Sequence, residues 1–193
     1  MIYVVDNNVF SMAFRNISPD VFPDIWVPWS NGMKEGKIIS IDEVFCEMEN
    51  LWGNKVESGL WLKEHKKYFL KPTNEEGYFI REIFKSKKFR EGIKEKSLRN
   101  GTPEADAMLV AKAKVLKGIV VTAEGEKENS EKIPNIATTF GVPYMNRDNF
   151  YKLLRNIHYG KEEYEGVNIC TQLLCAITLE SYLKGKKDLQ AVI

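Results

Sequence analysis

The segment Ile2-Tyr3-Val4-Val5-Asp6 is a short apolar, β-branched run that ends in an acid. Such a run predicts a buried strand, and the acid then stands at its carboxyl end. A second run of this kind, Ile119-Val120-Val121-Thr122, is followed two residues later by Glu124. Ligands of α/β proteins bind beyond the carboxyl ends of the strands. Asp6 and Glu124 therefore indicate a site at that edge of a sheet.

Helical patterns surround these two runs. A third strand is predicted over residues 142–145, and a brief extended link over 37–40. Helices are predicted over residues 9–14, 41–52, 56–68, 74–99, 104–116, 133–140 and 147–156. A further helix is predicted within the segment that begins at Phe22-Pro23 and stops at Gly36. The alternation of strands and helices predicts an α/β protein with a central, mainly parallel sheet.

Some of these helices have specific expected features. Trp26, Trp29 and Met33 share one helical face, which requires Pro28 to lie in the first turn. Ser40 is a candidate cap for the helix that follows it. Gly92 is a candidate interruption of the long charged helix over residues 74–99.

Composition places the chain among ordinary globular proteins. It has 193 residues, 44% of them hydrophobic and 28% charged, and its formal net charge is +1. No stretch approaches the roughly 20 apolar residues that a membrane span requires, and the first residues lack the features of a signal peptide. These features predict a cytoplasmic protein without a membrane partner.

Cysteine and histidine are too few and too scattered for a zinc site. Cys46, Cys170 and Cys175 form neither a disulfide framework nor a paired metal motif, and we expect buried or partly buried free thiols. The chain has only two histidines. Any metal must therefore be sought among carboxylates, which favour Mg²⁺ or Mn²⁺.

Basic residues are concentrated between Arg81 and Asn100, a stretch that contains eight basic and three acidic residues. The residues that we assign to RNA contact in this stretch are Lys85, Lys87, Lys88 and Arg90. The alternative is a solvated helix face. A surface that follows a phosphate backbone is favoured only if an active site lies beside it.

The chain changes character after Gly160. A charged linker leads into an apolar stretch, Val167–Leu183, which predicts a helix with apolar residues on several faces. Such a helix packs on its own core or on a partner, and a homodimer is one form of the second alternative.

Four acids occupy positions that a parallel sheet would bring together: Asp6, Glu47, Asp106 and Glu124. Clustered carboxylates repel one another, so a divalent cation would stabilise them. An ion bound through few carboxylates retains waters, one of which can attack a phosphodiester. Nearby polar residues that can hold waters or orient the acids are Asn8, Ser40 and Thr122.

Each acid also has an ordinary structural explanation. Asp6 could cap the following helix, and Asp106 would favour a helix N-terminus whatever its function. Glu47 and Glu124 could be solvated surface residues. The agreement of all four positions with one crevice favours the metal site.

In order and spacing, these segments resemble a PIN domain over residues 1–156. The resemblance rests on Val5-Asp6-Asn7-Asn8, Ile39-Ser40 with Val44-Phe45-Cys46-Glu47-Met48, residues 105–113, and Val120-Val121-Thr122-Ala123-Glu124. Two further stretches resemble a PIN-like branch of unassigned substrate: Phe22-Pro23 through Trp26 to Gly36-Lys37-Ile38-Ile39-Ser40, and Lys132-Ile133-Pro134-Asn135.

PIN domains are Mg²⁺- or Mn²⁺-dependent ribonucleases and include the VapC-like toxins of bacterial toxin–antitoxin pairs. The resemblance implies a three-layer α/β/α domain over residues 1–156, followed by a linker and an extra C-terminal helix over 157–193. It implies a toxin-like endoribonuclease with RNA as its substrate and an antitoxin protein as a partner.

Carried over position by position, the catalytic, metal-binding acids of the family fall on Asp6, Glu47, Asp106 and Glu124. Asn8 and Thr122 match its polar positions. Two residues depart from the pattern: Glu124 stands where Asp is commoner, and Asn7 where Ser or Thr is expected. Glu43, one turn before Glu47, competes for the second ligand position.

Two functions remain as alternatives. The first is a metal-dependent endoribonuclease that hydrolyses RNA phosphodiester bonds through the four acids. The second is a PIN-like module that has lost catalysis and binds RNA or a protein. A haloacid-type phosphatase would need a second Asp two residues after Asp6, where this chain has Asn8.

Overall fold

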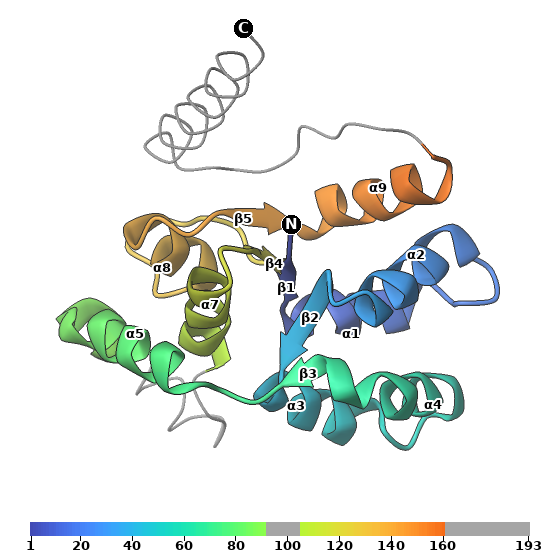
Figure 1. Cartoon of the computed structure of the whole chain (residues 1–193), viewed down its shortest axis with the longest axis horizontal. Coiled ribbons are helices and arrows are strands. Elements are labelled where there is room, and N and C mark those ends of the chain that lie inside the picture. Colours follow the sequence, from blue (N-terminus) through green and yellow to red (C-terminus); the bar gives the residue numbers. More distant parts are fainter. Residues whose placement is uncertain (92–104, 161–193) are drawn as a thin grey trace, which may run out of the picture.

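Five short parallel strands form the central sheet of the computed structural model, which describes residues 1–91 and 105–160 (Figure 1). The strands are β1 (Tyr3–Val5), β2 (Ile38–Ile41), β3 (Phe69–Leu70), β4 (Ile119–Thr122) and β5 (Tyr144–Asn146). Their order across the sheet is β3-β2-β1-β4-β5, and every neighbouring pair is parallel. The three predicted strands are confirmed. The extended link over 37–40 proves to be part of β2, and β3 was not predicted because it spans only two residues.

The strand order creates a crevice at one edge of the sheet. From β1 the chain proceeds outward through β2 to β3, then crosses back to β4 and proceeds outward to β5 on the other side. The direction of travel therefore reverses between β1 and β4, and the loops that leave these two strands diverge at their carboxyl ends. Val5 is paired with Val121, so Asp6 and Thr122 are the next residues on either side of this crevice.

Helices cover both faces of the sheet. They are α1 (Asn7–Asn16), α2 (Pro23–Lys34), α3 (Asp42–Trp52), α4 (Val56–His65), α5 (Asn74–Lys85), α7 (Ala105–Val115), α8 (Ile133–Thr139) and α9 (Arg147–His158). Figure 1 shows α5, α7 and α8 on one side of the strands and α1, α2, α4 and α9 on the other. The fold is thus a three-layer α/β/α arrangement, as predicted.

An aromatic cluster fills the layer that contains α1 and α2. Trp29 is fully buried and stacks on Phe10 with the ring centroids 5.0 Å apart. Trp61 of α4 packs edge-on against Trp26 at 5.3 Å. The predicted apolar face of α2 is therefore confirmed. Pro28, however, lies inside α2 rather than in its first turn, where Pro23 stands instead.

A buried ion pair joins α5 to α7. Lys112 Nζ lies 2.8 Å from Glu76 Oε1, and both side chains are almost completely buried. The same ammonium group donates a hydrogen bond to the carbonyl oxygen of Lys71 at 2.8 Å. Lys112 interrupts an Ala-rich apolar run, and its charge is neutralised by a carboxylate of the same chain.

Several predicted details are wrong. Ser40 does not cap α3, because it lies within β2 and the N-cap position belongs to Ile41. The long helix predicted over 74–99 ends at Lys85, and the chain becomes helical again over residues 87–91. The break thus falls at Ser86, whereas Gly92 lies outside the described residues. Cys46 is free but exposed, not buried.

Two boundaries shift slightly. The helix predicted over 56–68 ends at His65, and its last turn, Lys66–Tyr68, is a 3₁₀ helix. The helix predicted to end at residue 156 extends to His158. The apolar segment Val167–Leu183 lies outside the described residues. Within the described ranges, no helix is long and apolar enough to cross a membrane.

Candidate functional site

Asp6 lies at the carboxyl end of β1, in the crevice where the strand order reverses. Its backbone N–H donates to the carbonyl oxygen of Val121 at 2.9 Å, which fixes the residue against β4. Asp6 occupies the N-cap position of α1 but makes no side-chain capping hydrogen bond. Its Oδ2 instead accepts from the Thr122 hydroxyl at 2.9 Å. Helix capping therefore does not explain this acid.

Thr122 and Asn8 connect the start of α1 to the loop after β4. The Thr122 hydroxyl oxygen accepts from Asn8 Nδ2 at 3.3 Å and from the backbone N–H of Glu124 at 3.1 Å. Asn8 Oδ1 in turn accepts from the N–H of Ala123 at 2.8 Å. Both residues thus hold the Asp6 carboxylate and its surroundings in place, as expected of residues that orient a site.

Ser40 supports the same region from β2. Its hydroxyl is completely buried and donates to the carbonyl oxygen of Val5 at 2.6 Å. This bond fixes the peptide that immediately precedes Asp6. Ser40 therefore acts on the backbone next to Asp6 and not on its carboxylate.

The environment of Asp6 disfavours its negative charge. The side chain is buried, with the residue only 6% exposed. Burial, followed by the nearby charge of Asp106, raises the pKa of Asp6 to about 8; the charge of Glu124 acts in the same direction, and the Thr122 hydrogen bond opposes it. Asp106 opens α7, and Glu124 follows β4. The fold thus brings these three acids into electrostatic contact.

Glu47 is held near the start of α1 by a residue that the sequence analysis treated only as a departure. Asn7 Nδ2 donates to Glu47 Oε2 at 2.6 Å. The side-chain oxygen of Asn7 accepts from Ser11 at 3.0 Å, which fixes the orientation of the amide. Glu47 is therefore linked to the residue next to Asp6 and is not a freely solvated side chain.

Glu43 remains a competitor of Glu47. It lies one turn earlier on α3 and is partly buried. Its Oε2 atom is buried and has no hydrogen-bond partner among the described residues. A buried carboxylate oxygen without a partner is costly, so this atom is well suited to accept a ligand or a water.

Glu124 is turned toward α8. Its Oε1 lies 3.2 Å from Lys132 Nζ, and its Oε2 accepts from the N–H of Ile133 at 3.2 Å. In the part of the chain that the structure describes, no group of three or more His, Cys, Asp or Glu side chains is arranged so that it could hold a metal ion as it stands.

The residues nevertheless match the chemistry of a hard divalent cation. Carboxylate, amide and hydroxyl oxygens are the ligands and orienting groups that Mg²⁺ and Mn²⁺ use. No basic side chain among the described residues forms an ion pair with Asp6. A cation near these groups would offset the repulsion among the acids, which after burial is the next cause of the raised pKa of Asp6.

The four basic residues assigned to RNA contact are exposed. Lys85 pairs with Glu82 at 2.6 Å, and Lys87 lies 4.0 Å from Glu91. Lys88 lies over the ring of Phe89. Two of the four charges are therefore partly neutralised by neighbours, which makes this surface less basic than the sequence alone suggests.

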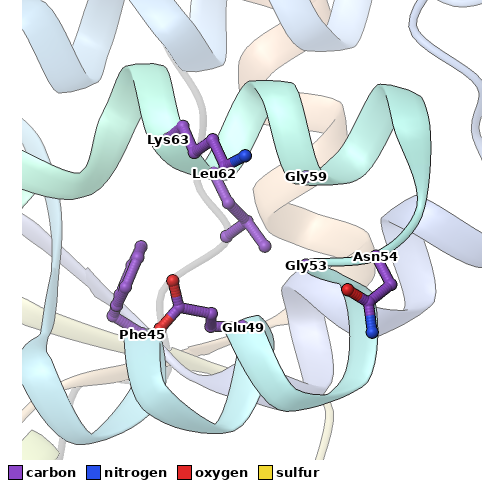
Figure 2. Close-up of a pocket in the computed structure, with 7 residues that line it drawn as sticks. All are labelled: Phe45, Glu49, Gly53, Asn54, Gly59, Leu62 and Lys63. Carbon is purple, nitrogen blue, oxygen red and sulfur yellow. The ribbon is translucent and has the colours of Figure 1, made fainter.

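A shallow pocket lies between α3 and α4 (Figure 2). Its volume is about 210 Å³, and it is lined by Phe45, Glu49, Gly53, Asn54, Gly59, Leu62 and Lys63. A Cβ atom on Gly59 would lie 2.4 Å from the Gly53 carbonyl oxygen, so glycine permits the close approach of the two helices there. None of the four acids lines this pocket.

Two residues of the site escaped the sequence analysis. Asn7 was noted only for differing from the family pattern, and its bond to Glu47 depends on a contact 40 positions apart. Lys132 was quoted within a motif but was given no role. The sequence offered one signal: the polar loop that begins near Glu124 ends in a lysine, Lys132. The length of the loop alone could not show that the two residues form a pair.

Of three comparisons with known proteins, one found a match. Neither the curated proteins nor the solved structures include a match to this chain. A family model described as a domain of unknown function, DUF4411, matches residues 3–157. This match spans most of the chain, including all four acids and both supporting residues, Asn8 and Thr122. The chain belongs to the DUF4411 family.

Proposed function

We propose that this chain is a Mg²⁺- or Mn²⁺-dependent endoribonuclease of the PIN-like kind, which hydrolyses RNA phosphodiester bonds. The observation that supports it most is the environment of Asp6. This acid is buried at the strand-order reversal, and Asp106 and Glu124 add to the negative charge around it. Acids with strongly perturbed pKa values in a crevice are typical of functional sites.

The residues divide the work between binding and orientation. When bound, a divalent ion supplies neutralisation of the scissile phosphate and a water of lowered pKa. Asp6 and Asp106 would hold that ion, with Glu47 and Glu124 as further ligands. Thr122 orients Asp6 through its hydroxyl, and Asn7 orients Glu47. No covalent intermediate on the chain is required, since phosphoryl transfer depends on positioning and charge stabilisation.

The toxin-like role belongs to the same proposal. It rests on the resemblance of the four acid-containing segments to VapC-like proteins, which implies an antitoxin partner. The exposed residues Lys85, Lys87, Lys88 and Arg90 would contact RNA phosphates and not bases. A small gene for a candidate antitoxin beside the gene for this chain would support this role.

The decisive experiment compares cleavage of single-stranded RNA by wild type, Asp6→Asn and Asp106→Asn in Mn²⁺. Each substitution keeps the side-chain shape and removes one charge, so we expect a loss of activity of about 100-fold or more. Asp20→Asn is the matched control. It changes an exposed acid, bonded to Ser18 in the loop before α2, and should leave cleavage unchanged.

Circular dichroism would verify that the variants fold. Equal cleavage by wild type and the two site variants would refute the proposal, whereas loss in both variants with an active control would support it.

A binding module without catalysis is the second candidate. Two observations favour it: Glu124 is paired with Lys132, and the described residues contain no group of three or more His, Cys, Asp or Glu side chains that could hold a metal ion. Calorimetry separates the two candidates. Saturable Mn²⁺ uptake that Asp6→Asn abolishes supports the enzyme, while RNA binding without Mn²⁺ uptake supports the module.

A further inference from the structure

The loop between β4 and α8 contains an acid and a lysine that bind each other beside the candidate metal site. Glu124 is the second residue of this loop, and Lys132 ends it at the N-cap position of α8. Lys132 Nζ lies 3.2 Å from Glu124 Oε1, and the N–H of Ile133 occupies Oε2 at 3.2 Å. One carboxylate oxygen of Glu124 therefore contacts the lysine that ends the loop, and the other accepts from the first residue of α8.

The two partners are exposed to different degrees. The Glu124 side chain is 14% exposed and the Lys132 side chain is 48% exposed. The lysine has a flexible stem and retains contact with water, so its ammonium group can leave the carboxylate at small cost. Glu124 is more confined, and its charge still reaches Asp6. Glu124 thus lies between the acids on one side and Lys132 on the other.

We propose that Lys132 is a tethered cation that occupies Glu124 while no divalent ion is bound, and that metal binding requires Glu124 to exchange this lysine for the ion. This inference rests on the proposed metal-dependent function and specifies how its site is regulated. Lys132 is a positioning residue, because it acts through Glu124. It would set the metal concentration at which the site fills.

The same arrangement gives a reason for glutamate at position 124. A glutamate is one methylene longer than an aspartate, so it can reach the Lys132 ammonium from the strand end and turn back toward Asp6. An aspartate at this position would have a shorter reach. Glutamate in place of aspartate at position 124 is therefore explained by the lysine at position 132 that it contacts.

Other hydrogen bonds also fasten the loop around this pair. Asn135 Nδ2 donates to the carbonyl oxygen of Lys127 at 2.9 Å, and the Tyr144 hydroxyl donates to Glu126 at 3.0 Å. These bonds hold the loop without Lys132. Removal of the lysine charge should consequently leave the loop in place, which makes substitution of Lys132 a clean test.

The test uses the full chain, freed of metal by a chelator and titrated with Mn²⁺ in a calorimeter at low ionic strength. Lys132→Met removes the competing charge and keeps the stem. We expect it to bind Mn²⁺ about three- to tenfold more tightly than wild type. Lys132→Arg keeps the charge, and Lys127→Met removes an exposed charge elsewhere in the same loop. Both should bind within about twofold of wild type, a factor set by the screening of exposed charges.

A second pair of variants tests whether Lys132 acts through Glu124. In a Glu124→Gln background, Lys132→Met should leave Mn²⁺ affinity unchanged. A gain in that background would show a general electrostatic effect and would overturn the proposal. A purely structural role of Lys132 also fails to produce a gain in affinity, so an unchanged or weakened affinity of Lys132→Met in the wild-type background overturns it as well.

The failure of this inference is distinguishable from the failure of the proposed function. If wild type shows no saturable Mn²⁺ binding, both are overturned. If wild type binds Mn²⁺ and Lys132→Met binds it equally well, only the tethered cation is overturned.

Discussion

Two buried carboxylates, Asp6 and Glu76, have opposite surroundings. Glu76 lies between α5 and α7 and contacts Lys112 at 2.8 Å, so its charge is neutralised within the chain. Asp6 lies at the end of β1 beside Asp106 and Glu124, and its nearest hydrogen-bond donor is the neutral hydroxyl of Thr122. A buried acid with its own cation stabilises a helix contact. A buried acid among other acids lacks such a partner, and this is where we propose that a cation from outside binds.

Lys112→Met should produce the largest change in stability. It leaves Glu76 buried without its partner, and breaking a buried pair in this way costs about 3–5 kcal/mol. Urea unfolding followed by circular dichroism would measure the loss. Lys85→Met is the control, because it breaks the exposed pair with Glu82 and should cost less than about 1 kcal/mol.

The double variant Lys112→Met with Glu76→Leu sharpens this prediction. Replacing both charges by apolar groups removes the uncompensated carboxylate, so most of the lost stability should return. If Lys112→Met alone lowers the free energy of unfolding by less than about 1 kcal/mol, the contrast between Glu76 and Asp6 fails. Such a result would show that Lys112 does not stabilise the buried charge of Glu76.

Asp6→Asn should act in the opposite direction on stability. Because its pKa is raised to about 8, Asp6 is mostly protonated at neutral pH in the metal-free folded protein, whereas the unfolded chain releases that proton. The raised pKa therefore costs stability, and an asparagine, which does not titrate, avoids this cost. The amide oxygen can still accept from Thr122. We therefore expect a gain of about 1–3 kcal/mol in the free energy of unfolding, together with loss of cleavage. Urea unfolding in the presence of a chelator would measure it, and a loss of stability would contradict the interpretation.

Glu43 and Glu47 test which acid of α3 belongs to the metal site. Glu43 has a buried oxygen without a partner among the described residues, whereas Glu47 accepts from Asn7. If Glu47 is the ligand, Glu47→Gln should weaken Mn²⁺ binding by about tenfold, and Glu43→Gln should change it less than twofold. The reverse result in calorimetry would assign the ligand position to Glu43.

His65 extends the comparison to a third buried ionisable side chain, with the smallest expected effect. Burial lowers its pKa, and a hydrogen bond to the carbonyl oxygen of Trp61 partly opposes this. The unfolded chain therefore takes up the proton more readily, and stability is lost as the pH falls through the unfolded value of about 6.5. When the pH falls from 7.5 to 5, wild type should therefore lose more of its free energy of unfolding than His65→Asn does. Equal losses would contradict this.

The candidate site was predictable from the sequence to the extent that it follows strand ends. Asp6 and Glu124 were located because β-branched runs precede them, and Asp106 because it opens a helix after a clear turn. Asn8 and Thr122 were named for their polarity and prove to bond each other. The partners Asn7–Glu47 and Glu124–Lys132 were not predictable, since neither follows from periodicity.

The errors in the fold have separate local causes. β3 spans two residues, too few to show any alternation. Pro28 was expected in the first turn of its helix, but Pro23 occupies that turn and Pro28 lies inside α2. The break at Ser86 was placed at Gly92 because glycine is the stronger local signal, although the helix had already ended.

The sequence by itself determined the layers of this protein and the order of its acids, because hydrophobic periodicity depends only on neighbours along the chain. Only the tertiary structure decided the charge partners of those acids. Lys112 neutralises Glu76 from another helix, Lys132 engages Glu124 across a loop, and the described chain supplies no ion-pair partner to Asp6. Ionic interactions act over distances in space, so the same carboxyl group becomes structural or functional according to what the fold places within a few ångströms of it.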